Sequence, residues 1–373
     1  MLVGSAFNDM KKQRSSKTPT LSESQISDLS RQYLLSRPLQ EEFTAKTVEL
    51  IKALLHVQRI EAHLIESRTK EPESFREKIN RSPHKYQNPL NEITDLSGIR
   101  IIVYYEKELN TISELIAKEF DIDWSNSSDK RKAHKPEEFG YQSIHYVVKL
   151  SKSRSSLLEW HHLAGLQAEI QVRTVLQHAW AAISHKLQYK REEDVPQILR
   201  RRLFRLSALL ELADEEFMIL RDKTNSLAEV VQYKLAEGDT DVEVNGLTIG
   251  VFLNTSQVVS AIVTDAQRAG FGFEPHPGDN DEDDFSDLVA LCNFLGLKTI
   301  FNLKVTLEHS TKWSYEYLLK QMQSNEGFWD ASPSFISQLI LIKAFSDRIT
   351  ISYLLKAGWD RGIAERVLKV ASE

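Results

Sequence analysis

The chain has 373 residues, of which 41% are hydrophobic and 27% charged, and its formal net charge is -6. This length allows two domains, and the composition is that of an ordinary soluble globular protein. The negative net charge disfavours a general nucleic-acid binder, so any polyanionic ligand would need a local basic site. The single cysteine, Cys292, excludes an internal disulfide, and no apolar run approaches the roughly 18 residues of a membrane span. We therefore expect a cytoplasmic protein.

The first half of the chain predicts a sheet with helices around it. Residues 1–20 are polar and are expected to form a flexible tail, and from Leu21 to about Ile65 the apolar spacing predicts helices. Beyond these, we expect strands over 97–105, 143–150 and 166–172 and helices over 107–120 and 174–187. This interleaving predicts a mixed α/β (α+β) domain over 21–192, with the sheet flanked by helices.

The second half of the chain predicts mostly helices. A helix from about Val195 to Asp222 carries clustered arginines near its start, and we assign 193–236 to a linking helix. A strand pair with an Asn-Gly turn is expected over 238–253, and an acidic loop over 276–287. The rest is expected to be helical, so 237–373 forms an accessory domain whose role the sequence does not indicate.

Cations gather around a predicted helix start in the segment SRTKEPESFREK. Arg68 and Lys70 precede Pro72, a residue typical of the first helical turn, and Lys78 follows within the helix. Free backbone N–H groups and the helix dipole would add to these charges, which suits an anionic ligand. Taken alone, this segment is better explained by a solvated helix start.

The segment TDLSGIRII places a carboxylate at the entrance to a strand. Asp95 precedes the strand, Gly98 permits a close approach, and Arg100 lies within the apolar run. A carboxylate in this position often binds Mg²⁺ in phosphoryl-transfer sites. The simpler alternative is an aspartate that caps a turn and an exposed arginine.

The segment KRKAHKPEEFGYQSIHYVV combines a basic loop that includes Lys135 with the aromatic residue Tyr141. Basic side chains beside an aromatic ring can bind phosphate and stack a base. Ser143 and His145 follow on one face of a strand. A mobile, solvated loop is the alternative for the charge run.

Strict alternation marks the segment AGLQAEIQVRT. Its apolar residues Ala168, Ile170 and Val172 would form one face of a strand, and Glu169, Gln171 and Arg173 the other. In the segment that follows, HAWAAISHKLQYK, the residues His185, Lys186, Tyr189 and Lys190 fall near the C-terminus of a predicted helix, where a lone histidine is usually structural.

Together, these segments resemble the synthetase domain of the RelA/SpoT alarmone synthetases over roughly residues 45–190. The resemblance lies in RTK with Ser74 and Lys78 downstream, DLSGIR, FGYQSIHYVV, EIQVRT and HAWxxIxHKLxYK, in the family's order. It implies a nucleotidyltransferase-like fold and transfer of pyrophosphate from ATP to the ribose 3′-hydroxyl of GDP or GTP. The products are AMP and ppGpp or pppGpp, and Mg²⁺ is required.

The resemblance also implies roles for individual residues. Asp95 and Glu169 are implied as Mg²⁺ ligands, and Glu169 also as the acceptor of the attacking hydroxyl's proton. ATP contacts are implied for Arg68, Lys70, Ser74, Lys78 and Arg100, with the two arginines sandwiching the adenine. Acceptor contacts are implied for Lys135, Tyr141, His145, Gln171 and Arg173.

Two features depart from the family pattern. Ser184 occupies a position where the family commonly has an acidic residue that recognises guanine, so the guanine preference is less secure. This leaves open a toxic small synthetase that transfers pyrophosphate to the 3′ end of tRNA. A binding module without catalysis is a further alternative. None of the eleven histidines is followed by aspartate, so we do not expect the hydrolase activity of bifunctional members. We expect no membrane partner. Whether the chain forms a homo-oligomer is left open by the sequence.

Overall fold

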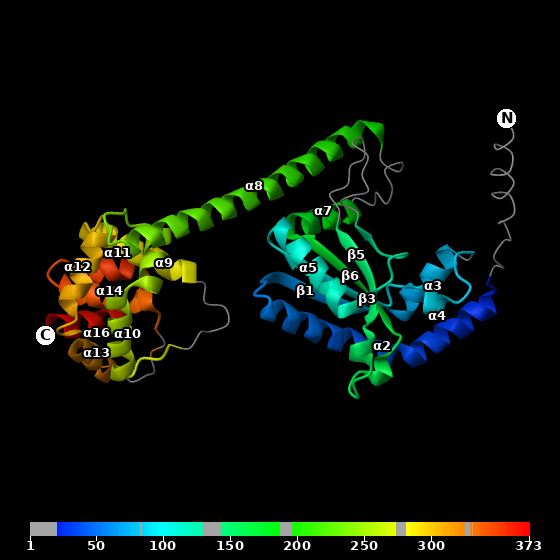
Figure 1. Cartoon of the computed structure of the whole chain (residues 1–373), viewed down its shortest axis with the longest axis horizontal. Helices are drawn as coiled ribbons and strands as arrows, with labels where there is room; N and C mark the ends of the chain where they lie inside the picture. The colour runs from blue at the N-terminus through cyan, green and yellow to red at the C-terminus, as the bar shows by residue number, and fades with distance from the viewer. Residues whose placement is uncertain are drawn as a thin grey trace. The chain divides into compact units, whose positions relative to one another are not determined.

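The computed structural model describes residues 21–82, 84–129, 143–186, 196–273, 281–324, 329 and 331–373. The chain divides into two compact units, Met1–Leu220 and Arg221–Glu373 (Figure 1). The predicted tail at 1–20 and the basic loop that includes Lys135 and Tyr141 lie outside the described residues.

A mixed sheet forms the centre of the first unit. Its strand order is β1-β2-β6-β5-β3, and β4 pairs with β5. The strands are β1 (Ala62–Thr69), β2 (Ser97–Val103), β3 (Phe120–Ile122), β4 (Ser128–Asp129), β5 (Ile144–Leu150) and β6 (Gln167–Thr174). Strands β2 and β6 are parallel and the other pairs are antiparallel. The predicted mixed sheet flanked by helices is confirmed.

Alternation along β6 determines which face of the sheet is covered. Ala168, Ile170 and Val172 are fully buried in a core shared with α2 (Glu23–Val57) and α5 (Glu106–Glu119). Figure 1 shows these two helices beside the sheet. The intervening polar residues Glu169 and Gln171 are only half-buried. One face of the sheet is therefore core, and the other face carries polar side chains.

The helices predicted up to about Ile65 end earlier than expected. Helix α2 ends at Val57, Arg59 adopts a left-handed conformation with φ 53°, and β1 begins at Ala62. The prediction was wrong at this point because β1 pairs along its length with β2, and sheet pairing outweighs a local helical pattern. Helix α3 (Pro72–Arg81) begins with Pro72, as the sequence predicted, and is followed by the short helix α4 (Pro89–Glu92).

Two further helices follow β6. Helix α7 spans Val175–Lys186 and α8 spans Gln197–Ala236. Trp180 of α7 and Leu203 of α8 are buried against each other in a small cluster. Between β5 and β6 lie a short helix, α6 (Lys152–Ser155), and a 3-10 turn, His161–Leu163.

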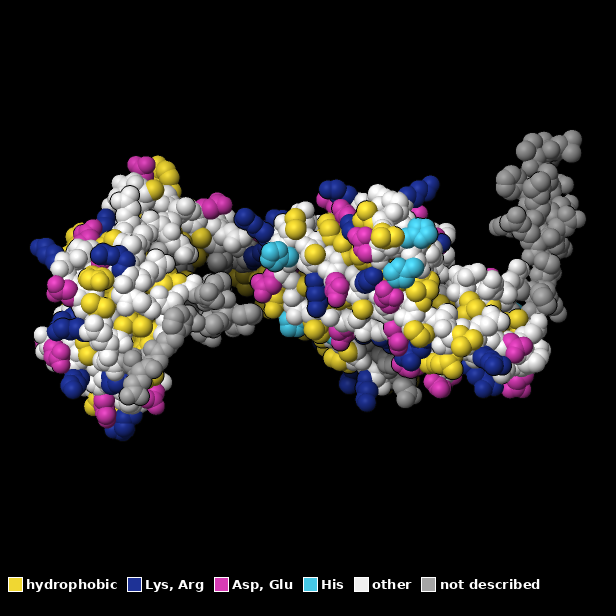
Figure 2. Space-filling view, turned by 90° about the horizontal axis from the view of Figure 1, so that it is seen from below, with side chains coloured by type: hydrophobic (Ala, Val, Ile, Leu, Met, Phe, Trp, Pro, Cys, Tyr) yellow, Lys and Arg dark blue, Asp and Glu magenta, His cyan; other side chains and the backbone are white. Residues whose placement is uncertain are grey.

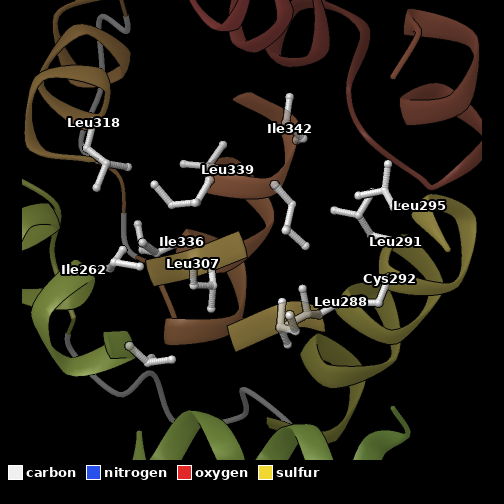
Figure 3. Packing of buried hydrophobic residues seen from close by; sticks show 14 of the residues in the cluster. Ile262, Leu288, Leu291, Cys292, Leu295, Leu307, Leu318, Ile336, Leu339 and Ile342 are labelled. Carbon is white, nitrogen blue, oxygen red and sulfur yellow. The ribbon is translucent and has the colours of Figure 1, made fainter. Parts of the chain in front are cut away.

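The second unit is helical, as predicted. Its helices are α9 (Gly246–Thr255), α10 (Gln257–Ala269), α11 (Asp281–Leu295), α12 (Ile300–Ser310), α13 (Ser314–Gln323), α14 (Pro333–Ala344), α15 (Ile351–Lys356) and α16 (Arg361–Ser372). Helix α14 is apolar around most of its circumference and almost wholly buried, which is typical of a central helix. Figure 3 shows its Leu339 and Ile342 among side chains of the surrounding helices. Cys292 is buried here, and burial raises the pKa of its thiol to about 12.

The strand pair predicted over 238–253 is wrong. Asn245 caps α9 instead of forming a hairpin turn, because its side chain accepts a hydrogen bond from the Thr248 backbone N–H at 3.0 Å. Ile249, Phe252 and Leu253 then follow at helical spacing and are buried. Glu243 forms an isolated bridge with Thr299. The acidic loop expected over 276–287 is also partly wrong, since α11 begins at Asp281.

Among the described residues, no single helix is long and apolar enough to cross a membrane. Helices α9 and α10 reach that length and hydropathy only as a pair, and the pair is bent by 69°.

Candidate functional site

The polar face of the sheet carries a hollow lined by residues from three neighbouring strands. The strand register places Arg68, Gly98 and Glu169 in one row and Glu66, Arg100 and Gln171 in the next. These residues line a cavity of about 180 Å³ together with Ser67, Asp95 and Ile99. Asp95 and Glu169, which are distant in sequence, therefore lie on the same hollow.

Asp95 lies in the turn before β2 and contacts two lysines. Lys70 Nζ lies 2.9 Å from its Oδ2, and Lys78 Nζ lies 2.8 Å from its Oδ1. Burial favours the neutral carboxyl, but the hydrogen bonds from Lys78 and Lys70 outweigh it and lower the pKa of Asp95. A backbone hydrogen bond of 2.8 Å from Lys70 N–H to Leu96 C=O holds β1 against this turn. Asp95 is thus an ionised carboxylate at neutral pH.

Glu169 is held by a histidine on the neighbouring strand β5. His145 Nδ1 lies 2.7 Å from Glu169 Oε1, and Gln171 Nε2 donates to the same oxygen at 3.3 Å. Burial raises the pKa of Glu169, but the hydrogen bond to His145 prevails and the pKa is lowered, although Asp95 acts against it. Glu169 is therefore also ionised at neutral pH, and its orientation is fixed from two sides.

Ser143 extends this hydrogen-bonded chain. Its Oγ lies 2.8 Å from His145 Nε2. Because Nδ1 faces a carboxylate, we assign the ring proton to Nδ1, and Nε2 then accepts from the Ser143 hydroxyl. The order Ser143, His145, Glu169 fixes the ring and the carboxylate together.

The two arginines of the hollow are arranged around Gly98. Arg100 donates to Glu66 Oε2 at 3.2 Å and to Gln171 Oε1 at 3.3 Å. Arg68 lies across Gly98, where a Cβ atom would sit 3.6 Å from Arg68 Cγ and 3.7 Å from its Nε. These are ordinary van der Waals distances, so the Arg68 side chain lies in contact range of the strand at Gly98 without requiring a glycine there.

Unpartnered polar atoms occur at the end of β6 and along α7. Arg173 Nε, His178 Nδ1 and Ser184 Oγ are buried without a hydrogen-bond partner in the described part of the chain. Arg173 is 6% exposed, and it donates through Nη2 to Gln171. Burial, followed by the nearby Arg100, lowers its pKa to about 10. Buried polar atoms usually have a partner, so Arg173 and His178, close to the end of β6, have unused capacity to bind a polar ligand.

Only some of the predicted site residues lie at the hollow or contact a residue that lines it. Lys70 and Lys78 border the hollow through Asp95, and His145 reaches it through Glu169. Ser74 is exposed on α3 and is not among the residues that line the cavity. Lys135 and Tyr141 lie outside the described residues.

Glu66 is a site residue that the sequence analysis missed. It pairs with Arg100 and lines the hollow. The alternation of Glu66 with Arg68 in HLIESRT could have identified it, because residues two apart share a face of a strand. That signal was hidden by extending the preceding helical pattern to Ile65.

The carboxylates of the hollow fit a hard cation whose coordination is completed by a bound ligand. Among the described residues, no group of three or more His, Cys, Asp or Glu side chains is arranged to hold a metal ion. Asp95 and Glu169 offer two ionised carboxylates on one hollow. Mg²⁺ is commonly bound through one or two carboxylates together with substrate phosphates. The two residues therefore fit Mg²⁺ better than they fit a cage made by the protein alone.

Residues 67–194 match a family model described as a region found in RelA and SpoT proteins. The match lies within the first unit and agrees with the resemblance that the motifs carried.

Two Bacillus subtilis proteins are similar to this chain. GTP pyrophosphokinase YjbM is 33% identical over 136 residues, which cover 36% of this chain and 61% of the relative. GTP pyrophosphokinase YwaC is 26% identical over 133 residues, which cover 36% of this chain and 60% of the relative. The chain thus spans about three fifths of the length of each relative. The crystal structure of small alarmone synthetase 1 from the same organism, bound to its product pppGpp, is 26% identical. It covers 53% of this chain and 99% of its own, with a TM-score of 0.40.

Proposed function

We propose that the first unit is a (p)ppGpp synthetase, which transfers pyrophosphate from ATP to the 3′-hydroxyl of GDP or GTP and releases AMP. The observation that carries this proposal is the pair of ionised carboxylates, Asp95 and Glu169, on one hollow that Arg68 and Arg100 also line. The relatives named GTP pyrophosphokinase support the same reaction. Because ATP and guanine nucleotides are cytoplasmic, we propose that the enzyme acts there.

The donor nucleotide binds along β1 and β2 in this proposal. Arg68 and Arg100 flank the adenine, since guanidinium planes stack on aromatic rings. Lys70 and Lys78 contact the phosphates, and Ser74 would join them at the start of α3. In the free protein both lysines bind Asp95. An incoming triphosphate competes for the lysines and so frees the Asp95 oxygens for a cation.

Mg²⁺, held by Asp95 and Glu169 with the donor phosphates, would neutralise charge on the transferred group. The lysines add to this neutralisation from the protein side.

Glu169 receives the proton of the attacking hydroxyl. Its lowered pKa makes Glu169 a weak base. A weak base is sufficient if the transition state is loose, because the attacking hydroxyl then needs little deprotonation before the phosphoryl group is transferred. His145 and Ser143 keep the carboxylate of Glu169 in place.

The acceptor nucleotide lies towards β5 and α7. Gln171 and Arg173 orient it, His145 lies beside its phosphates, and Lys135 and Tyr141 supply a phosphate contact and a stacking ring. The unpartnered atoms of Arg173 and His178 support a polar ligand at this end. Ser184 would meet the guanine edge in place of an acidic residue. The names of the relatives favour GDP or GTP over the alternative acceptor, the 3′ end of tRNA.

The substitution Glu169→Gln tests the proposal most simply. The amide keeps the shape of the side chain but neither accepts the proton nor carries the charge for Mg²⁺, so we expect kcat to fall by about 10³-fold. The assay follows γ-labelled ATP with GDP or GTP, and in parallel with deacylated tRNA. Glu159→Gln, an exposed carboxylate of the same unit, is the matched control. Retained activity in Glu169→Gln would remove Glu169 from the mechanism, and label in tRNA alone would replace the acceptor.

A further inference from the structure

We infer that Glu66 is a positioning residue, which holds Arg100 so that its flat face meets the base of the donor nucleotide; this rests on the proposed function. The strand register sets Glu66 of β1, Arg100 of β2 and Gln171 of β6 side by side in one row across the polar face of the sheet. Side chains in such a row are direct neighbours, because they point to the same face from adjacent strands. All three line the hollow.

Arg100 is held by the edge of its guanidinium group. Its Nη1 donates to Glu66 Oε2 at 3.2 Å, and its Nε donates to Gln171 Oε1 at 3.3 Å. The N–H groups of a guanidinium lie in the plane of the group, so neither bond covers one of its two faces. A guanidinium face stacks on an aromatic ring, whereas the edge binds carboxylate or phosphate. The two acceptors occupy part of the edge and so leave Arg100 the contact that suits a base.

Of the three carboxylates that line the hollow, Glu66 is the one that the proposed cation site does not use. Asp95 and Glu169 are the candidate ligands of that cation. Glu66 can therefore hold Arg100 while the donor and its cation are bound. The side chain of Glu66 is 41% exposed and that of Arg100 is 37% exposed, so the pair contributes little to the stability of the sheet.

The effect of the pair is expected in ligand binding. An arginine side chain that is already fixed loses less conformational freedom when a ligand arrives, which strengthens binding. Without Glu66, Arg100 would keep only its bond to Gln171 within this row, and its freed edge could bind phosphate. Loss of Glu66 should therefore weaken binding of the nucleoside part of the donor and spare binding of its phosphates.

Calorimetric titration of the full chain with two ligands tests this inference. The ligands are a non-hydrolysable ATP analogue and inorganic tripolyphosphate, each with Mg²⁺, and the wild-type protein should bind the analogue more tightly. Glu66→Met should reduce the ratio of the two affinities about fivefold, because a thioether does not hold the guanidinium in place. Glu66→Gln, whose amide oxygen still accepts from Arg100, should retain most of the ratio. Glu61→Met, which changes an exposed carboxylate just before β1, is the matched control.

Steady-state kinetics gives a second readout. In Glu66→Met the KM for ATP should rise about fivefold, while kcat and the KM for GDP change by less than about twofold. An equal loss of affinity for both ligands would mean that Glu66 only supports the sheet, and an unchanged ratio would mean that Arg100 does not need it. Either result would overturn the inference. Failure of the proposed function is seen separately, as a wild-type protein that binds the ATP analogue but forms no ppGpp from ATP and GDP.

Discussion

At the scale of single residues, the candidate site depends on how two carboxylates are held ionised. Asp95 is stabilised by two lysines and Glu169 by His145. The groups that stabilise the two carboxylates differ in what else they can bind. The two lysines are also suited to contact phosphates, whereas the second ring nitrogen of His145 is already hydrogen-bonded to Ser143. His145 is therefore a positioning residue in this structure, in addition to the acceptor contact that the family resemblance implies.

His145→Ala should lower kcat by about tenfold or more and leave the KM for ATP nearly unchanged. The reason is that Glu169 loses the hydrogen bond that orients it, while the donor-binding arginines are untouched. Steady-state kinetics measures both constants. His145→Asn keeps an N–H donor near the carboxylate and should recover part of the lost kcat. If KM for ATP rises while kcat is unchanged, His145 acts in binding and the positioning role is wrong.

At the scale of elements, the junction of β6, α7 and α8 connects the site to the rest of the first unit. Thr174 ends β6, one residue after Arg173, and its hydroxyl donates to Asp214 Oδ2 on α8 at 2.7 Å. Thr174 and Gln177 also exchange hydrogen bonds at the start of α7. Asp214 of α8 is thus hydrogen-bonded to the strand that carries Glu169.

Asp214 makes this junction sensitive to pH. Burial, followed by the charge of Glu106, raises its pKa to about 7. The folded state thus holds a proton that the unfolded chain releases near pH 4, so the contribution of Asp214 to stability falls as pH rises from about 4 to about 7. Asp214→Asn keeps an acceptor for Thr174 and removes the buried charge. Above pH 7 we expect it to stabilise the protein, by on the order of 1 kcal/mol.

Thermal unfolding at pH 5 and pH 8 checks this expectation. The gain from Asp214→Asn should be larger at pH 8 than at pH 5. A gain that is equal at both values, or a loss at pH 8, would show that the carboxylate has a compensating partner.

The sequence predicted those features of the site that depend on local pattern, and it missed those that depend on contacts between distant segments. The alternation in β6 predicted correctly that Glu169, Gln171 and Arg173 share a face, because period two is a property of the strand itself. The motif around Asp95 predicted its turn before β2. The pairing of Arg100 with Glu66 was missed, because the β1 register depends on contacts with β2 and not on local pattern. Asn245 before Gly246 suggested a hairpin, but a cap on α9 uses the same residue types.

At the scale of the whole molecule, the two units have separate cores that share no residue. The RelA/SpoT match lies within the first unit. On the face shown in Figure 2, Lys and Arg side chains are interspersed with Asp and Glu over both units. Such a mixed surface agrees with the net charge of -6. We therefore propose that polyphosphates bind at the local cluster of Arg68, Lys70, Lys78 and Arg100.

The most direct test is a calorimetric titration of the full chain with a non-hydrolysable ATP analogue, with and without Mg²⁺. If Asp95 and Glu169 hold the cation beside the donor phosphates, Mg²⁺ should tighten binding at least about tenfold. Asp95→Asn should abolish that gain and leave weak metal-free binding. If Mg²⁺ tightens binding to Asp95→Asn as much as to the wild-type protein, then Asp95 is not a metal ligand and the proposed site is wrong.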